Sequence, residues 1–299
     1  MIARGEPFAV VVPTRNRAAQ LDRLLDSLAQ QTQKDFDVVV VDQSDEPDAS
    51  LARRAEDEPR LHVLRDDGRG ASRARNVGWR AVGSDWIAYL DDDCIPEADW
   101  VAALRAELAS EPAAQLIIGD VGAHNAPGGD YLPVAVFPVS EERILKGRLV
   151  RPWRVGYSLA MAIRRTTLAE LGGWDERFGP GVPEYPASDD MDLNYRLLRS
   201  GGAAYLTPRL RASHDQWRTS EELVRLYSGY SRAWGGLVAK LVRTGDPIGA
   251  LLLTGGRVRG LVRRFGSAVT GRSRFRLRFA AAETRGFLTG LARGLRQSW

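Results

Sequence analysis

Apolar and polar positions alternate in blocks along the first third of the chain. Apolar runs at residues 8–12, 36–41 and 86–90 are typical of buried strands, and leucines at 21, 24, 25 and 28 recur at helical spacing after the first run. An Ala-, Arg- and Glu-rich stretch after residue 48 has helical composition. The alternation predicts βαβ units, and therefore an α/β fold with a mostly parallel, Rossmann-like sheet flanked by helices.

The same pattern predicts further elements up to residue 218. Strands are expected at residues 61–64, 115–119, 156–163 and 203–206. Helices are expected at residues 71–82, 97–108 and 188–200, and a shorter helix is expected to end near the glycine pair at 172–173. Residues 125–138 are rich in proline and glycine, which predicts an exposed loop.

The C-terminal part of the chain has a different pattern. At 100° per residue, one narrow apolar face is predicted for a helix over residues 251–269, and it consists of Leu251, Val258, Leu261, Val262, Phe265 and Val269. The opposite face carries Arg257, Arg259, Arg263 and Arg264. A second stripe, predicted for the next helix, consists of Leu277, Ala281, Thr284, Leu288, Leu291 and Leu295. These basic amphipathic helices suit an anionic membrane surface, or alternatively a subdomain packed on the body or on a second subunit.

Charge is distributed unevenly along the chain. Residues 240–299 contain 13 Lys and Arg against Asp246 and Glu283, a net charge of +11, which leaves −7 on the other 239 residues.

Cys94 is the single cysteine, so no internal disulfide can form. No stretch approaches the ~18 consecutive apolar residues of a membrane span, and the N-terminus lacks the form of a secretory signal. We expect a cytoplasmic protein, with peripheral attachment to the cytoplasmic membrane face as the alternative that the basic tail suggests.

Acidic and polar side chains follow the predicted strands at one edge of the sheet. The triplet Asp91, Asp92 and Asp93 comes directly after the strand at 86–90, and Asp42 ends the strand at 36–41. The first strand leads into Pro13, Thr14, Arg15, Asn16 and Arg17. Because the carboxyl ends of parallel strands meet at one edge, these groups are expected to converge there. The alternative is an acidic surface turn for the triplet and an Asx turn for Asp42.

Two other segments carry candidate chemistry. Gly70 opens a predicted helix with Arg73 and Asn76, a combination that suits a diphosphate or, alternatively, an ordinary solvated basic face. Asp189 and Asp190 stand at the start of another predicted helix, where carboxylates also pair favourably with the helix dipole.

Histidine is scarce in this chain. Only His62, His124 and His214 occur, and His214 follows the predicted strand at 203–206. Taken alone, His214 needs no role beyond a structural hydrogen bond.

Six segments together resemble family 2 glycosyltransferases of the GT-A fold, and the resemblance covers about residues 6–218. In chain order they are PTRNR at 13–17, VDQS at 41–44, GASRARNVG at 70–78, LDDD at 90–93, GGWDERF at 172–178 and SDDMDL at 188–193. The resemblance implies a nucleotide-sugar donor, a divalent metal and transfer with inversion.

The resemblance also implies roles for individual residues. Asp93 would be the principal ligand of Mn²⁺ or Mg²⁺, His214 would complete the metal or diphosphate shell, and Asp91 or Asp92 would hold the ribose or a metal-bound water. Asp190 would be the base that takes the acceptor proton, with Asp189 in contact with the acceptor. The family often has glutamate at the position of Asp189, which leaves open how Asp189 and Asp190 divide these two roles.

Trp174 is an acceptor-side candidate or a core residue. The nucleotide-sugar contacts implied are Pro13, Thr14, Arg15, Arg17, Asp42, Arg73, Asn76, Asp91 and Asp92.

The function predicted is transfer of one sugar from a UDP-, GDP- or dTDP-linked donor to a hydroxyl acceptor, which could be lipid-linked or a precursor of a cell-surface glycan. A nucleotidyltransferase acting on a sugar phosphate is the alternative enzyme class. Nucleic-acid binding through the arginine-rich tail is disfavoured by the acidic body. We expect a catalytic domain at residues 1–218, with a nucleotide-binding half at about 1–120 and an acceptor-binding half at 121–218, and a basic amphipathic helical region at 219–299.

Overall fold

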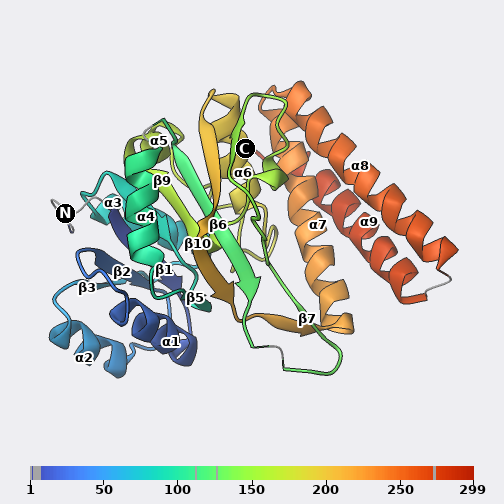
Figure 1. Cartoon of the computed structure of the whole chain (residues 1–299). Helices are drawn as coiled ribbons and strands as arrows, with labels where there is room; N and C mark the ends of the chain where they lie inside the picture. Colours follow the sequence, from blue (N-terminus) through green and yellow to red (C-terminus); the bar gives the residue numbers. More distant parts are fainter. Residues whose placement is uncertain (1, 3–7, 112, 126, 272–273) are drawn as a thin grey trace.

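The computed structural model describes residues 2, 8–111, 113–125, 127–271 and 274–299. Its centre is a nine-stranded mixed sheet with the order β3-β2-β1-β4-β9-β6-β10-β5, and β8 pairs with β10 beside this path (Figure 1). Strands β1, β2, β3, β4, β6 and β10 run in one direction. The predicted α/β class with a mostly parallel sheet is confirmed.

The strands have the following bounds: β1 Phe8–Thr14, β2 Asp37–Asp42, β3 Leu61–Arg65, β4 Trp86–Tyr89, β5 Cys94–Pro96, β6 Leu116–Ala123, β7 Tyr131–Pro133, β8 Arg143–Lys146, β9 Met161–Arg164, β10 Ala203–His214 and β11 Trp217–Thr219. The helices have these bounds: α1 Ala18–Ala29, α2 Ala49–Asp57, α3 Ala71–Ala81, α4 Trp100–Ser110, 3₁₀ helix η1 Pro152–Arg154, 3₁₀ helix η2 Ser158–Ala160, α5 Arg165–Glu170, α6 Asp189–Arg199, α7 Ser220–Arg243, α8 Pro247–Thr270 and α9 Arg274–Gly294.

Helices cover both faces of the sheet because each central strand is apolar on both sides. All seven residues of β1 are buried. Val10 and Val12 pack with α1, α2 and α4, whereas Val11 packs with α3, α5 and α6. Continuous apolar runs are expected for strands buried on both faces. The parallel register pairs Thr14 with Asp42, so the carboxyl ends of β1 and β2 lie side by side.

Strand β10 is three times as long as the predicted segment at 203–206. It pairs with β6, β8 and β5, and its register with β6 shifts between Leu206 and Arg211. Such a shift lets the strand bend and continue along the sheet. Its last residue, His214, lies opposite Cys94 of the short strand β5. The strand expected at 156–163 begins only at Met161, since η2 comes first. The loop expected at 125–138 contains β7, which pairs with β11.

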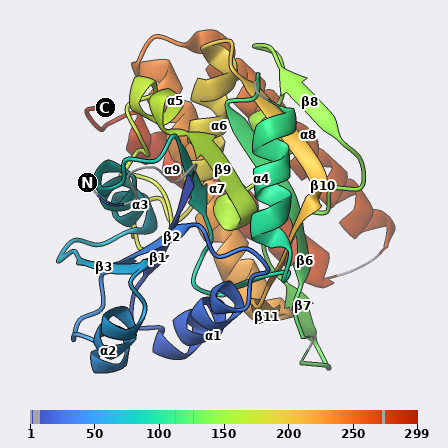
Figure 2. The same ribbon diagram turned by 60° about the vertical axis from the view of Figure 1, so that its left-hand side comes forward.

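The C-terminal helices α7, α8 and α9 lie together beside the sheet in Figure 1 and behind it in the turned view of Figure 2. They share an apolar core with Phe178, Tyr185 and Tyr195, which precede them in the chain. Helices α7 and α9 pack backbone to backbone, and a Cβ added at Gly290 would lie 1.9 Å from the carbonyl oxygen of Arg232. Among the described residues, no helix has the length and apolarity required to span a bilayer.

The buried and exposed sides of helix α8 differ from those that the sequence pattern predicts. Most of the predicted apolar face is exposed, with Leu251 74% and Val262 65% accessible. Arg257, predicted on the opposite polar face, is buried instead and pairs with Glu283 of α9. Helix periodicity identifies two faces but does not show which residues pack inward. Here the buried Glu283 pairs with Arg257 and Arg264, whereas Arg259 and Arg263 of the same predicted face stay exposed.

Candidate active site

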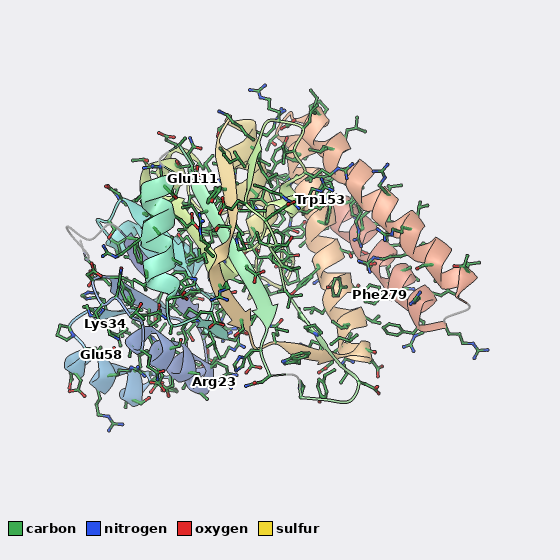
Figure 3. All side chains as sticks on the ribbon, viewed as in Figure 1. Arg23, Lys34, Glu58, Glu111, Trp153 and Phe279 are labelled. Carbon is green, nitrogen blue, oxygen red and sulfur yellow. The ribbon has the colours of Figure 1, made fainter. Side chains whose placement is uncertain are left out.

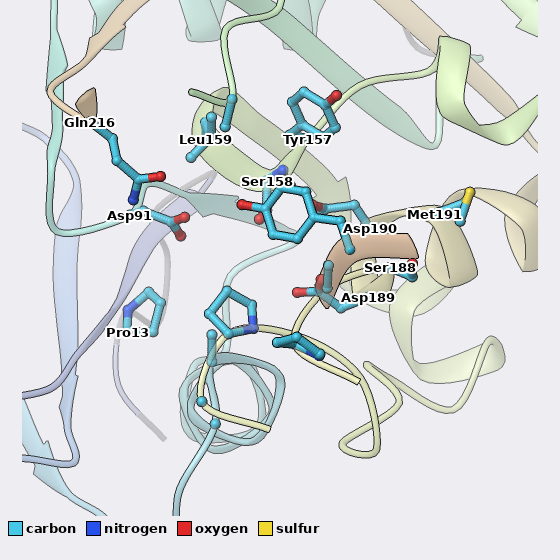
Figure 4. A pocket seen from close by; sticks show the side chains of 18 of the residues that line it. Pro13, Asp91, Tyr157, Ser158, Leu159, Ser188, Asp189, Asp190, Met191 and Gln216 are labelled. Atoms are coloured by element: carbon cyan, nitrogen blue, oxygen red, sulfur yellow. Dashed lines mark hydrogen bonds between the residues drawn. The ribbon is translucent and has the colours of Figure 1, made fainter. Parts of the chain in front are cut away.

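A cavity of about 560 Å³ opens where the carboxyl ends of β1 and β4 meet α6 and the C-terminal helices. Figure 4 shows Asp91 on one side of this space and Asp189 and Asp190 on the other. Many of the residues predicted from sequence line the cavity: Pro13, Thr14, Arg15, Arg17, Asp91, Asp92, Asp93, Asp189, Asp190 and His214. The fold therefore collects side chains from the N-terminal strands, from α6 and from the end of β10.

The three aspartates occupy the turn between β4 and β5, where the chain reverses to pair with β10. The turn holds Asp92 and Asp93 away from solvent. Thr14 donates a hydrogen bond from Oγ1 to Asp92 at 2.8 Å, and Arg17 forms ion pairs with Asp92 at 2.8 Å and with Asp93 at 2.6 Å. The alternative of an exposed acidic surface turn does not describe this arrangement.

Asp93 faces His214 because β5 and β10 are paired. The Nε2 atom of His214 lies 3.0 Å from Oδ1 of Asp93, and its Nδ1 atom lies 2.9 Å from the carbonyl oxygen of Val134. A carbonyl oxygen can only accept, so Nδ1 carries a hydrogen. Nε2 also carries one when it donates to the ionised Asp93 carboxylate, and without that second hydrogen its lone pair is available to a metal ion. This is the usual way in which a backbone carbonyl orients a metal-binding histidine.

The neighbouring carboxyl groups have different proton affinities. Burial opposes ionisation of Asp93, but the hydrogen bond and charge of His214, together with Arg17, lower its pKa to about 2. Burial raises the pKa of Asp92 to about 7, against the attraction of Arg17. Asp93 therefore carries a full negative charge at neutral pH.

A carboxylate oxygen and an imidazole nitrogen at one point form a donor set that fits Mn²⁺ or Mg²⁺. Asp93, Cys94 and His214 offer potential ligand atoms within 4.8 Å of one another. Burial raises the pKa of the Cys94 thiol well above its usual value, so the thiol stays protonated and is a poor ligand. The residues that could hold a divalent ion are therefore Asp93 and His214.

Arg75 of α3 connects the two sides of the cavity. This buried guanidinium donates to Asp91 at 2.7 Å and to Asp189 at 2.9 Å, and it lies over the Trp174 ring at 4.9 Å. Its charge partners outweigh the cost of its burial, and they raise its pKa. The sequence analysis assigned Arg73 rather than Arg75. Periodicity could have distinguished them, because the buried side of α3 includes Ser72, Arg75 and Asn76.

At the start of α6, Asp189 is buried and Asp190 is half-buried. Ser188, which directly precedes α6, has a left-handed φ of 70° and makes no capping hydrogen bond with its side chain. Oδ1 of Asp190 instead accepts a hydrogen bond from the backbone N–H of Ser158 at 3.0 Å. Burial and the adjacent Asp189 raise the pKa of Asp190 to about 8. A carboxyl group with a raised pKa in a cavity is a candidate for proton transfer.

Four predicted site residues do not line this cavity. Asp42 borders a smaller adjoining cavity of about 260 Å³ and pairs with Arg65 at 2.9 Å. Arg73 pairs with Asp66 at 2.8 Å. Asn76 is buried and donates to the carbonyl oxygen of Trp174 at 2.9 Å, and Trp174 itself packs edge-on against Tyr89 in the core.

The cavity also has lining residues to which the sequence analysis assigned no role. They come from η1, the segment before η2, and the C-terminal helices: Trp153, Tyr157, Tyr227, Tyr230, Ser231, Trp234, Arg257, Arg264 and Glu283. The available signal was the spacing of Tyr227, Tyr230 and Trp234, which places three aromatic side chains on one face of a helix.

Comparison with known proteins indicates the same family as the order of the six motifs. The family model described as Glycosyl transferase family 2 matches residues 9–172, more than half of the chain. The pre-mycofactocin glycosyltransferase of Mycobacterium tuberculosis (strain CDC 1551 / Oshkosh) is 28% identical over 261 residues, which cover 83% of this chain and 50% of that protein. The chain thus spans about half the length of this curated relative.

Solved structures share the fold at low sequence identity. The mannosyltransferase PcManGT from Pyrobaculum calidifontis, in complex with GDP-Man and Mn²⁺, has a TM-score of 0.58 and 16% identity, covering 97% of this chain and 87% of that one. S. aureus TarS 1–349, in complex with UDP-GlcNAc, has a TM-score of 0.56 and 17% identity, covering 76% of this chain and 66% of that one. The predicted GT-A fold is confirmed.

Proposed function

The chain belongs to glycosyltransferase family 2, and from this premise we propose that it is a metal-dependent, inverting enzyme that transfers a single sugar from a nucleoside diphosphate to a hydroxyl acceptor. The observation that carries the proposal is the convergence of Asp91, Asp92, Asp93 and His214 with Asp190 on one cavity. Family membership also decides the enzyme class against the nucleotidyltransferase alternative.

For the donor, we propose that Asp93 and His214 hold Mn²⁺ or Mg²⁺ beside the diphosphate. When bound, the ion would neutralise charge on the departing nucleoside diphosphate. The low pKa of Asp93 and the carbonyl-oriented His214 support this assignment. The single positive charge of Arg17 is shared between Asp92 and Asp93, which leaves negative charge at this turn for a metal ion to offset.

For the nucleoside, we propose that the base and ribose extend from the larger cavity into the smaller one. Thr14 and Arg17 line both cavities, and Asp42 lines the smaller one. A carboxylate there could accept a hydrogen bond from a base N–H. Pro13, Arg15 and Asp91 would border the ribose and diphosphate, whereas Arg73 and Asn76 would act only by holding α3 and the surrounding core in position.

For the chemistry, we propose Asp190 as the base. The acceptor oxygen forms a bond to the anomeric carbon while the bond from that carbon to the diphosphate oxygen breaks, and the electron pair leaves with the nucleoside diphosphate. Asp190 takes the acceptor proton. One displacement of this kind inverts the anomeric centre. Asp189, held by Arg75, would position the acceptor, and Trp174 would support Arg75 from the core.

For the C-terminal region, residues 219–299, we propose contact with an anionic membrane surface. Ile248, Leu251, Val258, Val262, Phe265 and Val269 form an exposed stripe along α8, here called the α8 stripe. Their spacing of three, four or seven residues keeps them on one side of the helix. Arg259 and Arg263 flank the stripe and are exposed. Packing of α7 and α9 on the body supports the helical-subdomain alternative as well, so the two predicted roles are compatible.

The experiment that tests the proposed function is a donor screen with product analysis. UDP-, GDP- and dTDP-linked sugars are incubated with the protein and Mn²⁺, and release of nucleoside diphosphate is measured. Release from one donor class, lost on removal of Mn²⁺, is the expected result. Release of pyrophosphate from a nucleoside triphosphate and a sugar phosphate, without nucleoside diphosphate release from any donor, would contradict the proposal.

A further inference from the structure

Part of the cavity lining consists of aromatic rings. Tyr227, Tyr230 and Trp234 project from one face of α7. Trp153 packs directly against Trp234, with ring centroids 5.2 Å apart and an interplanar angle of 43°, so these two rings form one continuous wall. Figure 3 shows Trp153 between the sheet and the C-terminal helices. Tyr157 completes this aromatic chamber, the name used below for the space between these five residues.

Buried charges line the same part of the cavity. Glu283 of α9 is 1% exposed and forms ion pairs at 3.0 Å with both Arg257 and Arg264 of α8. Arg257 is 8% exposed and donates a hydrogen bond to Ser231. Its Nε atom has no hydrogen-bond partner among the described residues. A buried donor without a partner is costly, so the chamber is suited to a ligand that supplies an acceptor.

The other end of the chamber reaches the proposed base. Ser158, which follows Tyr157 in the chain, donates its backbone N–H to Asp190. In Figure 4, Tyr157, Ser158 and Asp190 face the same space. A ring held between the aromatic walls could therefore present one of its substituents to Asp190 and another to the charged group at Arg257.

We propose that the aromatic chamber is the acceptor subsite and that it takes a polyhydroxylated six-membered ring, such as a sugar or cyclitol. This inference rests on the proposed function and specifies its acceptor class. The C–H faces of such a ring pack on aromatic side chains, and its hydroxyl groups are both donors and acceptors.

The charged end of the chamber selects the polyhydroxylated ring over a purely apolar one. An apolar ring would displace water from Arg257 and Glu283 without replacing the lost hydrogen bonds. A site built to hydrogen-bond hydroxyl groups discriminates strongly against analogues that lack them. The ring could belong to a free glycoside or to the head sugar of a lipid-linked acceptor, since both present the same chemistry to the chamber.

Saturation-transfer difference NMR tests this assignment with defined probes. The full chain is mixed with Mn²⁺ and UDP, GDP or dTDP, and with a panel of methyl hexopyranosides and myo-inositol, with cyclohexanol as the analogue lacking the additional hydroxyl groups. Binding of at least one polyhydroxylated ring and not of cyclohexanol is expected. The ring signal should persist when the nucleoside diphosphate is bound, because the two occupy different ends of the cavity.

Two variants connect the signal to the chamber. Trp234→Ala and Tyr227→Ala should each weaken ring binding by about tenfold or more while nucleotide binding is retained. Tyr131→Ala is the matched control, since Tyr131 is an exposed aromatic residue on β7 outside the cavity lining. Trp234 packs against the helical core, whereas Tyr227 is not among the residues of that core. The Tyr227 variant therefore keeps the test informative if Trp234→Ala fails to fold.

A further experiment distinguishes a free glycoside from a lipid-linked acceptor. It repeats the measurement with a short-chain lipid glycoside in place of the methyl glycoside. Retention of the same ring contacts with either probe supports the assignment of the ring to the chamber, and a stronger lipid-glycoside signal identifies the lipid-linked source. No ring binding in the unaltered protein, binding unaffected by both chamber variants, or displacement by the nucleoside diphosphate would overturn the inference. Loss of the nucleotide signal itself would count against the proposed function instead.

Discussion

Asp91 and Asp189 are held by one guanidinium group, that of Arg75, at 2.7 and 2.9 Å. The first carboxylate follows a strand of the N-terminal half, and the second begins a helix of the following half. Their shared partner is almost fully buried. The proposed donor side and acceptor side are thus connected through one side chain, which fixes their separation.

Replacing Arg75 by methionine should be strongly destabilising. The change leaves Asp91 and Asp189 without their buried partner, and removal of one member of a buried ion pair costs about 3–5 kcal/mol. Urea denaturation measures the free energy of unfolding. Arg73→Met is the matched control from the same helix, because the Arg73 side chain is 44% exposed and its pair with Asp66 should contribute no more than about 1 kcal/mol. Equal losses in the two variants would contradict this account of Arg75.

The pH dependence of transfer should follow Asp190. A base acts in its ionised form, and burial beside Asp189 raises the pKa of Asp190 to about 8. Turnover should therefore increase as pH rises through about 8. The pH–rate profile measures this increase in turnover. Asp190→Asn should abolish transfer at every pH while nucleotide binding is retained. An unchanged profile in the Asn variant would assign the proton transfer elsewhere.

The same raised pKa has a consequence for stability. Because the folded-state pKa of Asp190 exceeds its unfolded value, ionisation is disfavoured in the folded protein, and stability falls as pH rises toward about 8. Asp190→Asn lacks this penalty. Its melting temperature relative to the unaltered protein should increase between pH 4 and pH 8, by at least ~2 °C for a chain of this size. Thermal unfolding monitored by circular dichroism at several pH values measures the difference, and a constant or shrinking difference would contradict the assignment.

Glycine substitutions should separate close packing from helix propensity. Gly290→Ala would bring a Cβ to 1.9 Å from the carbonyl oxygen of Arg232, so α9 must move away from α7. Overpacking of this kind costs about 1–3 kcal/mol or more. Gly260→Ala in α8 meets nothing within 4 Å and should instead stabilise by up to about 1 kcal/mol. Chemical denaturation of both variants measures the contrast, and effects of the same sign would contradict the α7–α9 packing.

Membrane contact should depend on the α8 stripe. The double change Val258→Asp and Val262→Asp places charge on two exposed apolar positions and should reduce co-sedimentation with vesicles containing anionic phosphatidylserine by about fivefold or more. Ile144→Asp is the matched control, since Ile144 on β8 is also exposed but lies outside the stripe. Equal sedimentation of all three proteins would exclude the stripe as the contact surface.

The sequence predicted the sheet and its acidic edge because both depend on local patterns. The apolar runs of β1, β2 and β4 are long enough to identify, and the order of the six motifs indicates the fold. Strand β5 was missed because three residues show no periodicity, yet its pairing with β10 is what brings His214 to Asp93.

Other features depended on contacts between distant segments. Arg73 and Arg75 belong to the same motif. Helical periodicity separates their faces, but the packing of α3 is what brings Arg75 to the cavity and leaves Arg73 at the surface. The inward position of Arg257 required a partner on α9, and the aromatic chamber required η1, the segment before η2 and α7 to meet. Such arrangements are set by tertiary structure and leave only weak local signals.

The most direct test of the central claim is titration of Mn²⁺ in the presence of UDP, GDP or dTDP, followed by electron paramagnetic resonance of the free ion. The account predicts that the protein with its preferred nucleoside diphosphate removes the free-ion signal, that Asp93→Ala and His214→Ala weaken this binding by about tenfold or more, and that Asp190→Asn retains it. Binding of Mn²⁺ and nucleotide that is unchanged in both Asp93→Ala and His214→Ala would contradict the claim that these two residues hold the metal.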